Sequence, residues 1–413
     1  MNTERSAWAM LLVLISAFAL SQAFRTVAAI MAPPLQAEFG LTPQALGVFA
    51  GSFHFAFGSL QLFIGMGLDV YGPRRTVLAV FPLTIVGALV TATAPSFAWL
   101  VAGQVLTGIG CAPAFLACTV FIARRFEPAR FAPVNGMAMG LGSIGLLATG
   151  TPLAWIIEAW SWRAGFFVLA GCAGLAWLLI WRMVSDEPRP ADAAPQRLDI
   201  RAALRGYGEL FRLPHTAGIV ALALFTYAAF LALRGLWLGP LLIERHGFSL
   251  VHSGHVAFAV SATGIFAPPL FGRLDPGDRT RRRWIVGFAL ACALLFLLMA
   301  LQPGAWIDVA AALGIGVLSG FITMQYADVR AAYPSRLTGR AMAVYTMALF
   351  LGVALMQWLT GLAASWAHAI GVERYAAVLA AIAFFLGLGA LLFRVLPQPP
   401  ALRDAARFGT IAG

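Results

Sequence analysis

The sequence predicts an all-α integral membrane protein with twelve transmembrane helices in two pseudo-symmetric six-helix bundles. Three observations support this fold class. The 413-residue chain is 61% hydrophobic and only 11% charged, so it has too few polar groups to cover a soluble surface. It contains twelve mostly apolar runs long enough to cross a hydrocarbon layer about 30 Å thick. Its two halves also repeat each other at a nearly constant spacing.

The predicted spans follow one another through mostly short connections. We expect them at residues 8–32, 43–68, 76–94, 97–122, 133–157, 163–183, 215–242, 254–274, 285–302, 306–327, 340–366 and 375–396. The first run resembles a secretory signal, but Arg25 and the Pro33-Pro34 pair replace the small-residue cleavage pattern that such a signal requires. We therefore interpret it as a spanning helix.

The distribution of basic residues predicts that both termini are cytoplasmic. All 28 basic residues are arginines, and most of them fall on alternate connections. The predicted outer loops contain only Arg163, Arg245 and Arg374. The net charge of +11 then reflects topology and contact with anionic lipid, without a nucleic-acid partner. We expect a monomeric, multi-pass protein of the cell (inner) membrane.

The chain divides into four predicted regions. These are an N-terminal bundle (residues 1–184), a cytoplasmic linker (185–213), a C-terminal bundle (214–397) and a cytoplasmic tail (398–413). The second half of the linker places Leu198, Ala202, Leu210 and Leu213 among arginines. This pattern suits a helix at the membrane surface, and a plain connector is the alternative.

Matching residues in the two halves indicate an internal duplication. The matches are Arg25 with Arg234 at an offset of 209, Gly47 with Gly254 at 207, Asp69 with Asp275 at 206, and Arg74-Arg75 with Arg281-Arg282 at 207. Two bundles related in this way place a central cavity between the first helices of the halves.

Arg25 and Arg234 are the candidate substrate-binding residues, because each stands inside an otherwise apolar span. An ionised side chain at that depth costs about 3–17 kcal/mol unless it meets a partner or water. None of the 17 acidic residues is predicted near the middle of a span, so an incoming anion is the expected partner. In the alternative, each side chain extends to the outer interface, roughly 8 Å away.

Three further side chains are candidates for the same site. Gln22 and Tyr227 share helical faces with Arg25 and Arg234, although Tyr227 serves equally well as ordinary packing. His54 lies in a stripe of small and polar residues on the second span, which is typical of a moving seam between helices. It is a candidate for proton or substrate sensing, or a histidine bonded to a neighbouring helix.

The remaining reactive residues do not predict an enzyme. The four cysteines fall within apolar spans without metal-ligand spacing. A group in the predicted outer loop has metal-binding residue types, but solvated side chains are the favoured interpretation; its members are Glu244, His246, His252 and His255. The sequence contains neither a nucleophilic constellation nor a phosphate-cradling loop. We expect no catalytic residue, no cofactor and no resident metal.

The stretch Gly65 to Arg75, GMGLDVYGPRR, resembles the signature of the major facilitator superfamily between its second and third spans. Gly272-Arg273-Leu274-Asp275 with Arg281 to Arg283 resembles the degenerate second copy. The resemblance implies a conformational latch at the inner loops. Its residues are Asp69, Arg74, Arg75, Asp275 and Arg281. Val70 departs from the basic residue usual in the family.

The arginines of the first and seventh spans are similar to those that clamp phosphate in the organophosphate/phosphate antiporters of this superfamily. Organic anion symporters also carry a first-span arginine, commonly beside a carboxylate, where this chain has Phe24. Gln104 stands where many proton-coupled members have arginine. The fifth span, with Gly145, Gly150 and Pro152, only partly resembles drug/proton antiporters.

These observations predict a secondary active transporter that moves a small anionic organic solute, of carboxylate or phosphate type, by alternating access. A counter-transported anion or protons would drive it, as in an antiporter or a symporter. One alternative is a proton-coupled transporter of zwitterionic or larger carboxylated solutes, with His54 taking part. A second is a membrane receptor on the same fold, and a drug exporter is less favoured.

Overall fold

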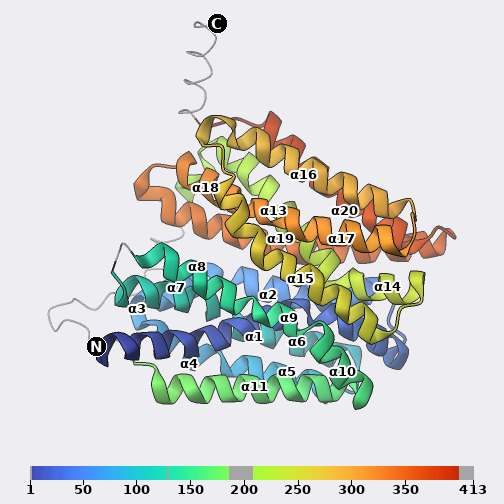
Figure 1. Ribbon diagram of the computed structural model, residues 1–413, viewed down its shortest axis with the longest axis horizontal. Coiled ribbons are helices and arrows are strands. Elements are labelled where there is room, and N and C mark those ends of the chain that lie inside the picture. Colours follow the sequence, from blue (N-terminus) through green and yellow to red (C-terminus); the bar gives the residue numbers. More distant parts are fainter. Residues whose placement is uncertain (1, 128–129, 186–207, 400–413) are drawn as a thin grey trace, which may run out of the picture. The chain divides into compact units, whose positions relative to one another are not determined.

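The computed structural model describes residues 2–127, 130–185 and 208–399, and every regular element in these ranges is a helix (Figure 1). Eleven of the described helices are long and apolar enough to cross a membrane. A twelfth candidate is the pair Pro43–Ser59 and Gln61–Leu68, bent by 42°. The all-α membrane fold is thus confirmed. Most of the predicted linker and tail lies outside the described residues.

The chain forms two compact units. The first contains Met1–Leu198 and Gly235–Phe258, so it includes a segment from the second half of the chain. Its helices are α1 (Asn2–Phe39), α2 (Pro43–Ser59), α3 (Gln61–Tyr71), α4 (Pro73–Val80), α5 (Pro82–Ala92), α6 (Phe97–Cys111), α7 (Ala114–Arg125), α8 (Phe131–Gly142), α9 (Ile144–Ala148), α10 (Thr151–Ala159), α11 (Trp162–Met183) and α14 (Leu238–His246).

The second unit contains Asp199–Arg234 and Ala259–Gly413. Its helices are α13 (His215–Ala232), most of α15 (Leu250–Arg273), α16 (Asp278–Ala300), α17 (Ala305–Leu318), the 3₁₀ turn η3 (Ser319–Phe321), α18 (Ile322–Ala332), α19 (Ser335–Ala369) and α20 (Arg374–Val395). A π-helical turn, η2 (Leu233–Trp237), joins α13 to α14 and contains the boundary between the units.

Each unit contains a close helix–helix contact at a glycine, and these two contacts correspond to each other. In the first unit, Gly108 of α6 lies against the main-chain carbonyl of Phe53 in α2. In the second, Gly316 of α17 lies against the carbonyl of Val260 in α15. A Cβ at Gly108 would overlap the carbonyl of Phe53, and a Cβ at Gly316 would overlap the hydroxyl of Thr263 and crowd the carbonyl of Val260, so each helix pair packs this closely at a glycine. The pairs are related by offsets of 208 and 207, which supports the duplication predicted from sequence.

A second pair of corresponding glycine contacts involves α1, which contains Arg25, and α13, which leads to Arg234. Gly145 of α9 packs on the main chain of Ala19 in α1, and Gly352 of α19 packs on the main chain of Leu224 in α13. The glycines are again 207 residues apart, whereas Ala19 and Leu224 are 205 apart. The sequence offset between the contact positions on α1 and α13 is therefore two residues smaller than the offset between the two glycines.

The two predicted inner loops begin their following helices in the same way. Gly72, with φ 84°, precedes α4, and Gly277, with φ 82°, precedes α16. Positive φ favours glycine because it lacks a Cβ. This shared turn places Arg74 and Arg281 in the first turns of their helices.

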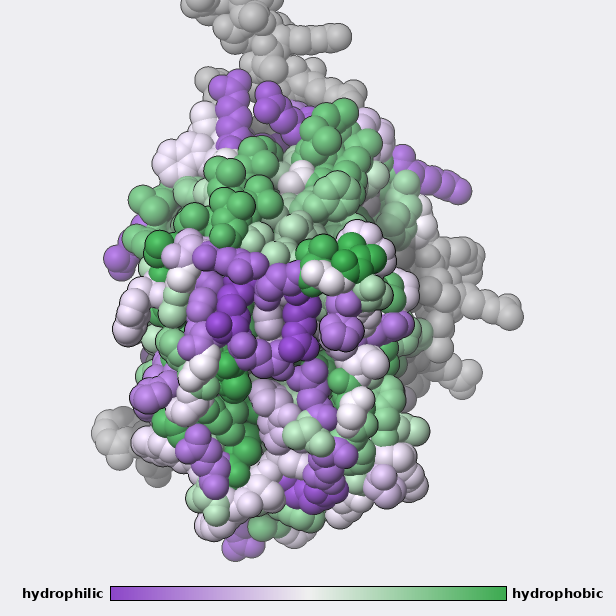
Figure 2. Space-filling model, turned by 90° about the vertical axis from the view of Figure 1, so that its right-hand side faces the viewer, coloured by the Kyte–Doolittle hydropathy of each residue, from purple (hydrophilic) through white to green (hydrophobic). Residues whose placement is uncertain are grey.

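The surface carries many large apolar side chains, as expected of a chain surrounded by lipid. Examples are Trp155, Phe167, Leu175, Phe266 and Leu294, all exposed. Figure 2 shows one face, on which hydrophobic patches lie beside a group of hydrophilic side chains.

Candidate functional site

Arg25 lies in the interior of the first unit, with 6% of its surface exposed. Its Nη1 donates a hydrogen bond of 2.5 Å to Oε1 of Gln22, and its Nη2 donates one of 3.5 Å to the hydroxyl of Ser21. Both partners come from the preceding turn of α1, where spacings of three and four residues share a helical face. The guanidinium also lies over the ring of Phe57 in α2, at 4.6 Å. Burial of the head group does not fit extension to the exposed surface.

Arg234 lies inside the π-helical turn and is fully buried at 0% exposure. Its Nε donates a hydrogen bond of 2.8 Å to the hydroxyl of Ser261 in α15, which is also fully buried. Pro240 follows this turn closely, and as a proline it has no N–H to donate to the carbonyl of Leu236, a bond that a regular α-helix would contain. Single π turns inside α-helices occur frequently at functional sites.

The two arginines differ in their positions along their helices. Measured from the repeated glycine contact within each unit, Arg25 lies six residues after Ala19 and Arg234 lies ten residues after Leu224. Four residues are about one helical turn, or roughly 6 Å. Measured from this contact, Arg234 therefore stands about one turn farther along its helix than Arg25 does.

The other candidates have defined surroundings. Tyr227 packs edge-on against Phe350, with ring centroids 5.7 Å apart, which fits the packing interpretation. His54 is 1% exposed, and its Nδ1 lies 3.2 Å from the carbonyl oxygen of Ala50 on its own helix. The predicted bond from His54 to a neighbouring helix stays a prediction.

Ser261 and Phe57 are neighbours of the arginines that the sequence alone does not predict. A signal for Ser261 was present, because the repeat offset of 207 maps His54 onto Ser261. Phe57 lies one turn after His54 on α2, but an aromatic residue in an apolar span carries no distinguishing pattern.

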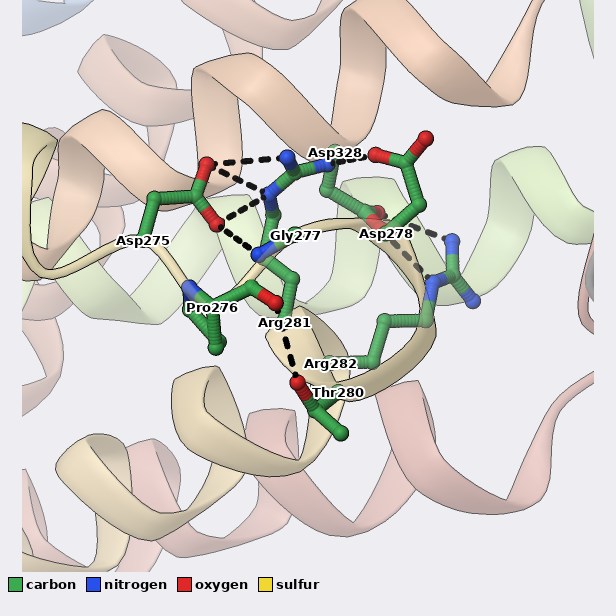
Figure 3. Close-up of polar contacts among 8 residues, drawn as sticks. All are labelled: Asp275, Pro276, Gly277, Asp278, Thr280, Arg281, Arg282 and Asp328. Atoms are coloured by element: carbon green, nitrogen blue, oxygen red, sulfur yellow. Dashed lines mark hydrogen bonds and ion pairs between the residues drawn. The ribbon is translucent and has the colours of Figure 1, made fainter.

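The predicted inner loop of the second unit forms an ion-pair network (Figure 3). Arg281 bonds both carboxylate oxygens of Asp275 through Nε, at 2.9 Å, and pairs with Asp278 at 2.5 Å. Arg282 forms a bidentate pair with Asp328 of α18, at 2.8 and 2.9 Å. Asp328 is 5% exposed. The sequence alone does not predict this pair, whose members are 46 residues apart.

Ionisation of Asp275 is favoured by its partners. Partial burial opposes the charged form, but hydrogen bonds from Arg281 and from the N–H of Gly277 outweigh it and hold the pKa of Asp275 below its ordinary value. The carboxylate is therefore available to Arg281 at any physiological pH.

The inner loop of the first unit makes different contacts. Arg74 donates to the main-chain carbonyl of Trp181 at 2.8 Å, and Arg124 donates to that of Leu68 at 3.3 Å. Arg75 is exposed. The side chain of Asp69 lies outside the described residues, so its part in the predicted latch stays a prediction.

The predicted outer-loop group lies on helices. Glu244 and His246 belong to α14, while His252 and His255 belong to α15. The expectation of a longer loop was wrong because α14 continues to its left-handed cap at Gly247. His255 Nδ1 bonds the hydroxyl of Thr151 at 2.7 Å. In the described part of the chain, no three His, Cys, Asp or Glu residues are grouped to hold a metal ion.

Comparison with known proteins identifies the family. Residues 13–357 match the family model described as Major Facilitator Superfamily. The chain belongs to the major facilitator superfamily. A bacterial homologue of the human lysosomal transporter Spinster, solved in an inward-facing and occupied conformation, matches with a TM-score of 0.74 and 17% identity, over 93% of this chain and 95% of that one. At that identity the likeness shows the fold alone.

Several curated members of the superfamily are similar in sequence. The "Probable sulfoacetate transporter SauU" of Cupriavidus necator is 26% identical, over 62% of this chain and 61% of its own length. The hexuronate transporter of Bacillus subtilis is 24% identical, over 55% of this chain and 54% of its own. An MFS-type efflux pump of Mycolicibacterium smegmatis is 28% identical, over 71% and 68%. The first two relatives are thus matched over less than two thirds of their length.

Proposed function

We propose that this protein is a secondary active transporter of small organic anions, acting by alternating access in the cell's inner membrane. The observation that carries the proposal is the pair of buried guanidinium groups, Arg25 and Arg234, on the helices that begin the two halves. Each is oriented by a hydrogen bond to a neutral side chain. A guanidinium fixed in this way suits the recognition of a planar carboxylate, which accepts two parallel N–H bonds.

The names of the relatives support a carboxylate-bearing substrate. Three of the similar proteins are named as transporters of sulfoacetate, hexuronate and D-galactonate. All three compounds are small anions that carry a carboxylate. In our proposal Arg25 and Arg234 bind the carboxylate, with Gln22 orienting Arg25. The inner-loop groups Asp275 and Arg281, together with Asp69, Arg74 and Arg75, would act as the conformational latch.

Thermal-shift measurements on the purified protein test the substrate class. We expect sulfoacetate, D-galactonate or D-glucuronate to raise the melting temperature, because a ligand bound to the folded state stabilises it by mass action. Glycerol 3-phosphate separates phosphates from carboxylates. The stabilising anion should then exchange across proteoliposomes loaded with the same anion, and binding without flux would contradict transport.

One observation favours a second function. The efflux pump relative matches a larger share of this chain than either anion transporter. An exporter of organic cations or neutral drugs predicts stabilisation by such compounds and none by carboxylates. The same thermal-shift panel decides between them when it includes a lipophilic cation.

A further inference from the structure

The hydrogen bond between Arg234 and Ser261 stands where two helices pass from one compact unit to the other. One boundary between the units falls between Arg234 and Gly235, inside the π-helical turn. The other falls between Phe258 and Ala259 in α15, one turn before Ser261. We call these two boundaries the crossing points. The bond from Arg234 Nε to Ser261 Oγ, 2.8 Å long, therefore connects residues of the second unit that lie next to both crossing points.

The segment between the crossing points, Gly235–Phe258, is held by the first unit. Gly239 of α14 lies against the main-chain carbonyl of Ala29, one turn after Arg25 on α1. At the start of α15, the N–H of Val251 donates to Glu158 of α10 at 3.2 Å. The chain on either side of the crossing points is therefore anchored in different units.

The π-helical turn gives this junction a means to bend. A π turn holds more residues than an α turn, so its hydrogen-bond ladder is irregular and it accommodates changes of direction. One inserted residue rotates the side chains before it relative to those after it by about 100°. Pro240, near the start of α14, lacks the N–H that would bond the carbonyl of Leu236 in a regular α-helix.

The internal repeat shows that Ser261 differs from its counterpart. The offset of 207 places Ser261 at the position of His54, whose Nδ1 lies near the carbonyl of Ala50 on its own helix. Ser261 instead accepts a bond from another helix. Its hydroxyl is fully buried together with the head group that it contacts.

We propose that Ser261 is a positioning residue for Arg234 at a hinge formed by Leu233–Trp237. The hydroxyl holds the guanidinium in the second unit while Gly235–Phe258 turns with the first unit. Arg234 consequently keeps its orientation toward a bound anion during the conformational change. The anion in this statement rests on the proposed function, whereas the hinge does not.

Amide hydrogen exchange of the purified protein without ligand tests the hinge. In Ser261→Ala we expect peptides covering residues 229–240 to exchange at least about threefold faster, because the turn loses its anchor to α15. Ser261→Thr keeps the hydroxyl and should match the wild type. Ser253→Ala is the matched control, since its hydroxyl is also buried on α15 but bonds the carbonyl of Leu250. Deleting Gly235 removes one residue from the π turn and should slow exchange there.

Anion binding and exchange test the positioning role, with sulfoacetate and D-galactonate as probes. We expect Ser261→Ala to weaken binding about tenfold, because Nε of Arg234 loses the hydroxyl that accepts its hydrogen bond. Ser261→Thr should recover affinity to within about threefold. Deletion of Gly235 should reduce exchange across proteoliposomes at least about tenfold, since a regular helix resists bending.

Each result decides a separate point. Unchanged hydrogen exchange in Ser261→Ala, or faster exchange spread over the whole protein, overturns the hinge even if no anion binds. Should the deletion variant fail to fold, the Ala and Thr variants still decide. If no carboxylate or phosphate stabilises the wild type, the proposed function fails and the hinge stands or falls on hydrogen exchange alone. Anion binding by Ser261→Ala at wild-type affinity overturns the positioning role.

Discussion

The two halves of the chain hold corresponding arginines in different ways. In the first unit, Arg25 bonds side chains on its own helix, and Arg74 bonds a main-chain carbonyl. In the second unit, Arg234 bonds a serine on another helix, and Arg281, the counterpart of Arg74, bonds the carboxylate of Asp275 in the loop before its own helix. A duplicated sequence has thus kept its cations while changing what fixes them.

The largest expected difference concerns the buried pair at the inner loop. Arg282→Met leaves Asp328 in the protein interior without its bidentate partner, which should destabilise the fold by about 3–5 kcal/mol. Arg75→Met, at the matching exposed position, should cost less than about 0.5 kcal/mol. Thermal denaturation in detergent measures both.

The double variant Arg282→Met with Asp328→Leu is the control. It should recover most of the lost stability, because a buried pair replaced by apolar side chains leaves no isolated charge. Equal melting temperatures for Arg282→Met and Arg75→Met would contradict the difference between the loops.

The repeated glycine contacts predict where the halves respond alike. Gly145→Leu and Gly352→Leu each drive a side chain into the main chain of a neighbouring helix, and each should lower stability by about 1–3 kcal/mol. The control is Gly387→Leu, because a Cβ there meets nothing within 4 Å. Tolerance of leucine at only one of the two glycines would show that the duplication is not preserved in packing.

The neighbours of the arginines predict a smaller effect on anion affinity. Gln22→Leu removes the acceptor of Arg25 Nη1 and should weaken binding about tenfold, equivalent to about 1.4 kcal/mol. Tyr227→Phe keeps the ring that packs on Phe350 and should bind like the wild type. Comparable losses in both variants, measured by ligand-dependent thermal shift, would return Tyr227 to the binding site.

The smallest expected effect is the pH dependence at Asp275. Its folded-state pKa lies below the ordinary value of 3.8, so the carboxylate stabilises the fold fully above that value. This contribution is lost as the pH falls through the lowered pKa. Asp275→Asn should therefore show a shallower loss of melting temperature between about pH 4 and pH 3, by less than about 1 kcal/mol. A steeper loss than in the wild type would contradict the sign.

The fold was largely predictable because apolar run length reports membrane spans directly. The exception is informative: the second span bends between Ser59 and Gln61, which lowers the length of each piece without changing composition. The division between units was less predictable. Gly235–Phe258 groups with the first unit through contacts at Gly239 and Val251, which no linear pattern records.

The candidate site was predictable only in its charged residues. Arg25 and Arg234 stand out because a charge in an apolar run is costly. Their partners differ in sequence separation: Gln22 is three residues from Arg25 and follows from helical spacing, whereas Ser261 is 27 residues from Arg234. The π turn also escaped prediction, since one extra residue in a helix leaves hydropathy unchanged.

The most direct test is calorimetric titration of the purified protein with the carboxylate that stabilises it most, in the wild type, Arg25→Ala and Arg234→Ala. Arg283→Ala, an exposed inner-loop position, is the control. We predict one anion bound per wild-type and control molecule, and at least about a hundredfold weaker binding in each of the other variants, as expected when a charged pair of hydrogen bonds is lost. Wild-type affinity in either Arg25→Ala or Arg234→Ala would contradict the account.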